Sequence, residues 1–266
     1  MVDNAARNER GAHVGSLTET PPSADERSSS SDSGEIGIVA LAQFGAFVAV
    51  AVATLPFLTK DLELKPGLAP ILVGLASSWP VLFAAVVFVA QRRSVAWRDL
   101  VGARSARVVD LGALVLGGAL QAAVGVAYFL AGVDEDRVSG PARGLTERAG
   151  SIGVGFFVLA AFVVVGAPIV EELFYRGAVF NAIRRAFGVT DPPRRFDRIT
   201  IMAIGISSIW FGAIHGQLLQ FPALVAVGVV CAVARVRTGR IATAICLHAG
   251  FNLTSIVALG MQLADK

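Results

Sequence analysis

The chain has 266 residues, of which 55% are apolar and only 16% are charged, whereas about a quarter of the residues in an ordinary soluble domain are charged. Its mean hydropathy is +0.66. These values exclude an ordinary soluble protein and a fully disordered one, and they indicate a chain that lies largely in membrane hydrocarbon.

The net charge of +3 is distributed unevenly. Residues 1–35 contain three Arg and seven Asp or Glu, so they carry −4 and the remainder carries +7. Most of that positive charge lies in short loops between apolar runs, which is typical of a membrane protein and not of a nucleic-acid groove. We therefore expect the lipid bilayer as a partner, and no nucleic acid.

Residues 1–35 are rich in Ser, Asp and Glu and lack an apolar run, which predicts a disordered cytoplasmic tail. Apolar runs suited to crossing a bilayer follow along the rest of the chain. They are Ile36–Leu58, Ala69–Ala90, Leu111–Val133, Ser151–Val170, Ile199–His215, Leu218–Val236 and Ile241–Leu263. The sequence thus predicts an all-α, polytopic bundle of about seven transmembrane helices in the cell membrane. Gly118 and Ala122 form a small-xxx-small step suited to close helix packing.

Arginine-rich loops alternate with loops that are poorer in net positive charge. The rich ones follow the second, fourth and sixth apolar runs and contain Arg92, Arg93, Arg98, Arg104, Arg107, Arg184, Arg185, Arg194, Arg195, Arg198, Arg237 and Arg240. Because basic loops stay on the cytoplasmic side, we expect the amino terminus in the cytoplasm and the carboxyl terminus outside.

Six polar side chains lie within or beside the later apolar runs, where an ionisable group costs roughly 2.5 kcal/mol or more at the membrane centre. They are Glu171, Glu172, Arg176, His215, His248 and Asn252. They could join helices or mark a misplaced helix end, but so many on three runs favour a functional site.

The spacing of these residues suggests chemistry. Glu172 and Arg176 stand at i and i+4 in the orientation that favours an ion pair, and Glu171 points about 100° away around the helix. A carboxylate and an imidazole can activate a water molecule, and an imidazole and an amide, such as His248 and Asn252, can donate to an oxyanion. Hydrolysis of an amide bond is the economical interpretation.

A zinc site is the alternative interpretation of the same donors. One Glu and two His, namely Glu171, His215 and His248, are ligand types that zinc accepts. The H-E-x-x-H helix of zinc proteases is absent, so a metal role rests on ligand type alone and no cofactor is certain.

Three motifs occur in order on successive apolar runs: EExxxR at Glu171–Arg176, FxxxH at Phe211–His215 and HxxxN at His248–Asn252. This arrangement resembles the CPBP (CAAX protease and bacteriocin-processing, or Abi) family of intramembrane proteases, which includes the Ras-converting CAAX prenyl endopeptidase and bacteriocin-immunity proteins. The resemblance covers roughly residues 150–260. The segment 188–198 departs from it as an extra cytoplasmic loop.

The resemblance implies roles for the matching residues. Glu171 and His215 would activate the attacking water, His248 and Asn252 would form the oxyanion site or position other groups, and Glu172, Arg176 and Phe211 would support the site. It favours a metal-independent glutamate mechanism slightly over a metalloprotease. The substrate would be a peptide or protein, possibly with a prenylated carboxyl terminus. Residues 36–150 would then be accessory transmembrane helices and 151–263 the catalytic core.

These roles place a demand on helix geometry. The carboxylates can approach the histidines if one long helix, kinked near Pro168, runs from about Ser151 to Arg185. A separation of more than about 10 Å between Glu171 and both histidines would defeat the assignment. Two other functions stay open: a proton- or ion-coupled transporter, for which buried ionisable residues are also typical, and a non-catalytic immunity or scaffold protein.

Overall fold

The computed structural model describes residues 24–58, 69–96, 107–134, 153–190 and 196–264. In these ranges all regular structure is helical, which confirms the all-α prediction. The helical segments are α1 (Ala24–Leu58), α2 (Ala69–Arg92), α4 (Val108–Leu130), α6 (Val154–Ala161), η1 (Phe162–Gly166), α7 (Ala167–Glu172), η2 (Leu173–Val179), α8 (Phe180–Ala186), α9 (Arg198–Ile214), α10 (Phe221–Thr238) and α11 (Ile241–Ala264).

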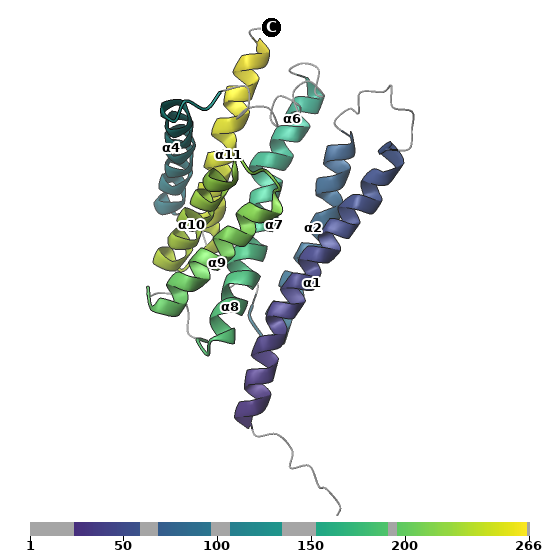
Figure 1. Cartoon of the computed structure of the whole chain (residues 1–266), viewed down its shortest axis with the longest axis vertical. Coiled ribbons are helices and arrows are strands. Elements are labelled where there is room, and N and C mark those ends of the chain that lie inside the picture. The colour runs from purple at the N-terminus through teal and green to yellow at the C-terminus, as the bar shows by residue number, and fades with distance from the viewer. Residues whose placement is uncertain (1–23, 59–68, 97–106, 135–152, 191–195, 265–266) are drawn as a thin grey trace, which may run out of the picture.

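The run from α6 to α8 lies between two groups of helices (Figure 1). The antiparallel pair α1 and α2 packs on one side, and α4, α10 and α11 lie on the other. Six helical spans are long and apolar enough to cross a membrane, so the protein is a multi-pass membrane protein. The start of α1 and the carboxyl terminus lie at opposite ends of the bundle, as the predicted orientation requires. Which end faces the cytoplasm stays a prediction from loop charge.

The fifth predicted span is the one that falls short. Helix α9 has 17 residues, or about 26 Å at the α-helical rise, which is less than the hydrocarbon thickness. Asp197 begins the helix by accepting the Thr200 N–H at 2.7 Å. The helix ends at Ile214 with His215 as its C-terminal cap, and the next residue, Gly216, adopts a left-handed conformation (φ 64°) that stops α-helical pairing. This ending holds His215 within the bundle.

The length of the helix predicted for Ser151–Arg185 is confirmed by a continuous helical span, Val154–Ala186. Its irregularity takes the form of two π-helical segments, η1 and η2, which flank the carboxylate pair. Pro168 has no N–H to donate, and the Ala167 N–H bonds to the Phe162 carbonyl instead of the carbonyl four residues back. Single π turns of this kind concentrate at functional sites.

The prediction of disorder throughout residues 1–35 is wrong for its last part, since α1 already begins at Ala24. Glu35 is only 1% exposed. Its carboxylate accepts hydrogen bonds from Arg93 Nε at 2.5 Å and from Arg185 Nε at 2.6 Å. Two cations therefore hold this turn of α1 against the ends of α2 and α8. Residues 1–23 lie outside the described ranges.

Helices α4 and α11 cross at very short distance. A Cβ atom placed on Gly117 would lie 1.9 Å from the Leu247 carbonyl oxygen, and one on Gly250 would lie 1.9 Å from the Leu114 carbonyl oxygen. The small-xxx-small pair predicted from the sequence, Gly118 and Ala122, begins one residue after the glycine at this crossing. A Cβ on Gly118 would lie 2.9 Å from the Thr254 hydroxyl, whereas Ala122 is exposed. Close approach of this kind fixes membrane helices without a hydrophobic driving force.

Gly117→Ala is expected to lower stability by about 1–3 kcal/mol, because the new methyl group forces the two backbones apart. Thermal unfolding of the purified protein in detergent would measure the change. Gly125→Ala is the matched control, since no atom lies within 4 Å of the Cβ position there and alanine improves helix propensity. Equal stability of the two variants would contradict the proposed crossing.

Candidate active site

The two adjacent carboxylates lie in the last turn of α7, between the π segments. Glu172 is fully buried, whereas the Glu171 side chain keeps 17% of its surface exposed. The two side chains therefore occupy different environments, as the 100° step around a helix predicts. One acid faces the protein interior and the other can reach water or a substrate.

Glu172 forms the buried ion pair that its spacing predicts. Its Oε1 atom lies 3.0 Å from Arg176 Nη1, and Arg176 Nη2 donates to the Gly228 carbonyl of α10 at 2.8 Å. The guanidinium also lies over the Phe211 ring, 5.1 Å from its centroid. Arg176 thereby compensates a carboxylate that would be costly to bury alone, and it joins η2 to α9 and α10.

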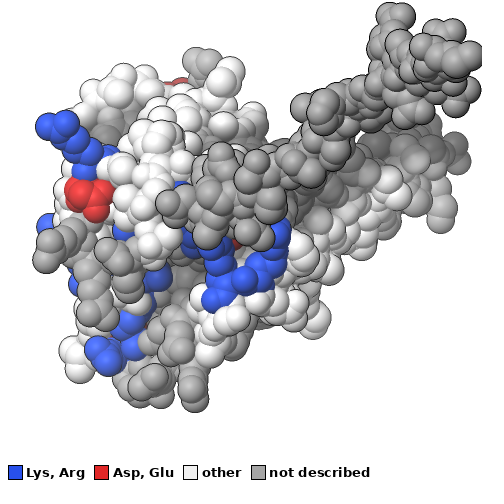
Figure 2. Space-filling model, turned by 90° about the horizontal axis from the view of Figure 1, so that it is seen from below, with Lys and Arg blue, Asp and Glu red and all other residues white. Residues whose placement is uncertain are grey.

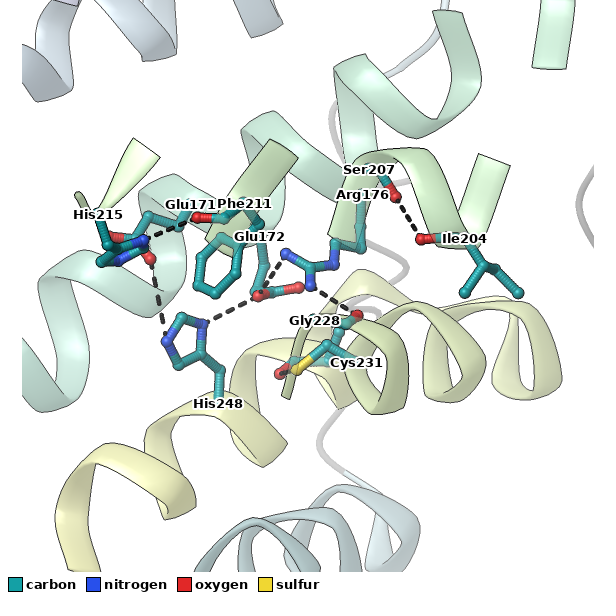
Figure 3. A network of polar contacts seen from close by, with 11 residues as sticks. Glu171, Glu172, Arg176, Ile204, Ser207, Phe211, His215, Gly228, Cys231 and His248 are labelled. Carbon is teal, nitrogen blue, oxygen red and sulfur yellow. Dashed lines mark hydrogen bonds and ion pairs between the residues drawn. The ribbon is translucent and has the colours of Figure 1, made fainter. Parts of the chain in front are cut away.

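His248 on α11 lies between the two carboxylates (Figure 3). Its Nδ1 atom is 2.9 Å from Glu172 Oε1, and its Nε2 atom is 3.9 Å from Glu171 Oε2. An ionised carboxylate only accepts hydrogen bonds, so Nδ1 carries a proton and Nε2 faces Glu171. The separation from Glu171 is below the limit of about 10 Å set by the sequence argument.

His215 at the end of α9 is oriented by its own helix. Its Nδ1 atom lies 2.7 Å from the Phe211 carbonyl oxygen, which fixes the proton on Nδ1 and leaves Nε2 for other contacts. Phe211 packs edge-on against both imidazoles, with centroid separations of 4.8 Å to His215 and 5.6 Å to His248. The supporting aromatic residue of the FxxxH motif thus gathers the two histidines around one ring.

Asn252 shares a helix face with His248, but its amide makes a different contact from the one expected. Its Nδ2 atom donates to the Val163 carbonyl at 2.8 Å. Five residues after Val163 stands Pro168, which lacks an N–H, and the Ala167 N–H is taken by Phe162. Asn252 therefore satisfies a backbone carbonyl that the π segment leaves without a helical partner.

The donor set does not fit the zinc alternative. Among the described residues, no group of three or more His, Cys, Asp or Glu side chains is arranged to hold a metal ion. Glu171, His215 and His248 therefore do not form the expected ligand set, and a metalloprotease is not supported.

A buried contact from α1, which the sequence did not predict, supports the site. Tyr175 Oη donates to Gln43 Oε1 at 2.5 Å, and the Tyr175 ring packs edge-on against Phe211 at 5.3 Å. An amide inside the apolar run Ile36–Leu58 was the available signal. The contact joins α1 to the residue that precedes Arg176, so a helix outside the three motifs supports the site.

Comparison with known proteins gives one match, to a family model. Residues 153–254 match the family model of the Type II CAAX prenyl endopeptidase Rce1-like proteins. The matched range contains all three motifs, and it confirms the resemblance predicted from them. No curated protein and no solved structure matches the chain significantly.

Proposed function

Because residues 153–254 form an Rce1-like type II CAAX prenyl endopeptidase family domain, we propose that this protein is an intramembrane endopeptidase that uses Glu171 to activate water. The observation that supports it best is the place of His248 between a buried, paired carboxylate and a partly exposed one. The buried ion pair consists of Glu172 and Arg176 and does not involve Glu171. Glu171 is therefore available to act on a water molecule.

In the proposed reaction, Glu171 removes a proton from water as the oxygen attacks the carbonyl carbon of the scissile peptide bond. His215 assists through Nε2, since its Nδ1 proton is engaged by Phe211. The carbon–nitrogen bond then breaks, and the proton held by Glu171 passes to the leaving amine. Both products leave with atoms and charge balanced.

His248 would stabilise the negative oxygen of the tetrahedral intermediate. Glu172 accepts the hydrogen bond from Nδ1, so a proton on Nε2 would make a cation whose charge Glu172 balances while Glu171 holds the proton taken from water. Of the two roles expected for Asn252, the oxyanion site and the positioning of other groups, we assign it the second. Its amide donates to the Val163 carbonyl in the π segment before Glu171. Buried donors of this kind act strongly because water is excluded.

The substrate class follows from the family alone. We propose a peptide or protein with a carboxy-terminal C-a-a-X sequence and a prenylated cysteine, because that chemistry names the family whose model matches. A prenyl chain would lie in the bilayer beside a site held within the helical bundle.

Cleavage of a prenylated C-a-a-X peptide by the purified protein tests the proposal. His215→Ala is expected to reduce the rate about 10²-fold or more, the usual loss on removing a general acid–base group. His13→Ala is the matched control, since the third histidine lies outside the family domain, and it should cleave as the wild type does. Undiminished cleavage by the His215 variant would contradict its role, and transport without cleavage would favour the transporter.

A further inference from the structure

One face of α1 is buried against the helical run that carries the carboxylates, although α1 precedes the family domain. The buried side chains described on this face are Glu35, Val39, Gln43 and Ala46, each no more than 7% exposed. They recur at the spacing of three and four residues that aligns side chains along one side of a helix. Phe44, on the other side, is exposed. The buried face of α1 therefore includes two polar side chains, Glu35 and Gln43.

Glu35 fastens one end of this face. It lies at the end of the bundle over which arginine side chains are spread (Figure 2), and Arg93 and Arg185 engage its carboxylate. At the α-helical rise, Arg185 is about 21 Å along the helix from Glu171. The ion pairs of Glu35 therefore attach α1 to α2 and α8 at a distance from the candidate active site, and this attachment does not require Gln43.

Gln43 lies about 12 Å further along α1, inside the apolar span Gly34–Leu55. An amide buried there costs free energy unless it is hydrogen-bonded, and leucine would pack without that cost. The Gln43 Oε1 atom accepts the Tyr175 hydroxyl at 2.5 Å, and Tyr175 is buried. The hydroxyl group therefore has Gln43 as its partner where solvent hardly reaches, and the hydrogen bond fixes the position of the tip of the Tyr175 ring.

Tyr175 is linked to both candidate histidines through one aromatic ring. Its own ring packs edge-on against Phe211, with 5.3 Å between the centroids, and Phe211 packs edge-on against His215 and His248. Tyr175 and Phe211 are both buried. Because close-packed side chains transmit displacements to their neighbours, a shift of the Tyr175 ring moves Phe211. A shift of Phe211 in turn moves both imidazoles.

We propose that Gln43 is a positioning residue for the hydrolysis and acts by holding Tyr175. Held in this way, the Tyr175 ring confines Phe211. Phe211 in turn orients His215 and His248. This inference rests on the proposed function, since the orientation of the histidines affects a rate only if they act on the substrate. A small misplacement of catalytic groups caused by a distant change can lower a rate substantially, and residues that lock a catalytic side chain in its rotamer support catalysis without touching the substrate.

Two single variants and their combination test the effect on the rate. Tyr175→Phe removes the hydroxyl and keeps the ring, and Gln43→Leu removes the amide with little change in volume. On a prenylated C-a-a-X peptide, each is expected to lower kcat about tenfold, with KM within about twofold of the wild-type value. In the double variant neither side chain of the pair is left with an unpaired polar group. Its Tm should therefore return close to the wild-type value, while kcat stays low.

Phe44→Leu is the matched control, because it changes the exposed neighbour of Gln43, and it should keep both kcat and Tm. Tyr175→Phe decides the case if Gln43→Leu does not fold. If the hydrogen bond served only to attach α1, kcat would return together with Tm in the double variant. That result, or a kcat for Tyr175→Phe within about twofold of the wild-type value, would overturn the proposal.

The three histidines of the chain allow a test that does not depend on cleavage. Their ring C–H signals are recorded by NMR on 13C-histidine-labelled protein in detergent, and they are assigned by replacing each histidine in turn. An aromatic ring shifts the signals of the protons beside it, and the Phe211 centroid lies 4.8 and 5.6 Å from those of two imidazoles. Tyr175→Phe is expected to shift the signals of His215 and His248 and to leave the signal of His13 unchanged.

The NMR result separates this inference from the proposed function. Phe44→Leu should shift none of the three histidine signals. Unchanged signals of His215 and His248 in the Tyr175→Phe variant would overturn the proposal, whatever the rate of cleavage. A wild type that cleaves no peptide while these signals move would reject the proposed hydrolysis, whereas Gln43 would still position the histidines.

Discussion

Glu171→Gln is expected to reduce peptide cleavage by about 10²–10⁴-fold, the range for loss of a general acid–base group, while the protein stays folded. Glutamine has nearly the same shape but cannot accept the proton of water. Glu171 is partly exposed, and its Oε2 atom lies 3.9 Å from His248 Nε2. Replacing it leaves no buried charge without a partner. Initial rates on a prenylated C-a-a-X peptide, with Tm measured in parallel, would check both parts.

If Glu171 acts in catalysis, its replacement must lower the rate of cleavage without lowering Tm. A Glu171→Gln variant that loses activity and Tm together would indicate a structural carboxylate. Glu171→Asp is the informative companion, because it keeps a base but withdraws it by one methylene, and partial activity is expected.

A chelator added to the wild type is expected to leave cleavage unchanged, since the described histidines and acids form no metal-holding group.

The helical architecture could be predicted from sequence because apolar length and loop charge are local properties. The extension of the fourth helix past Glu171 was also predictable, since the polar residues had to meet. The π segments were not, because hydrophobic periodicity does not distinguish i+4 from i+5 pairing. Consequently the contact from Asn252 to Val163, which depends on a carbonyl without a helical partner, could not be anticipated from the HxxxN spacing.

Long-range contacts account for the other differences. Glu35 lies at the end of a segment with the composition of a polar tail, and its partners Arg93 and Arg185 stand 58 and 150 residues away in the sequence. Only the packing of α1 beside α2 and α8 brings the three together. The Gln43–Tyr175 contact spans 132 residues and was hidden for the same reason. Charge patterns predict which side of a membrane a loop occupies, but they do not predict which charges pair.

The buried Glu172–Arg176 pair should dominate stability. Both side chains are within 1% of full burial, and removing one charge leaves the other without compensation. Glu172→Gln and Arg176→Met are each expected to lower stability by about 3–5 kcal/mol. Arg237→Met, an exposed arginine on α10, is the control and should change little. Thermal or denaturant unfolding in detergent would provide the comparison.

The double variant separates the fold from the chemistry. With neither charge present, no buried charge is left without a partner. The stability lost by the Glu172→Gln, Arg176→Met double variant should therefore be smaller than the sum of the losses in the two single variants. Cleavage should not return with stability, because His248 then lacks the ionised partner 2.9 Å from Nδ1 that would balance a charged imidazole. Additive losses would show that the two side chains are not coupled. Recovery of activity together with stability would mean that the carboxylate serves only to neutralise Arg176, and that the charge on His248 is balanced elsewhere.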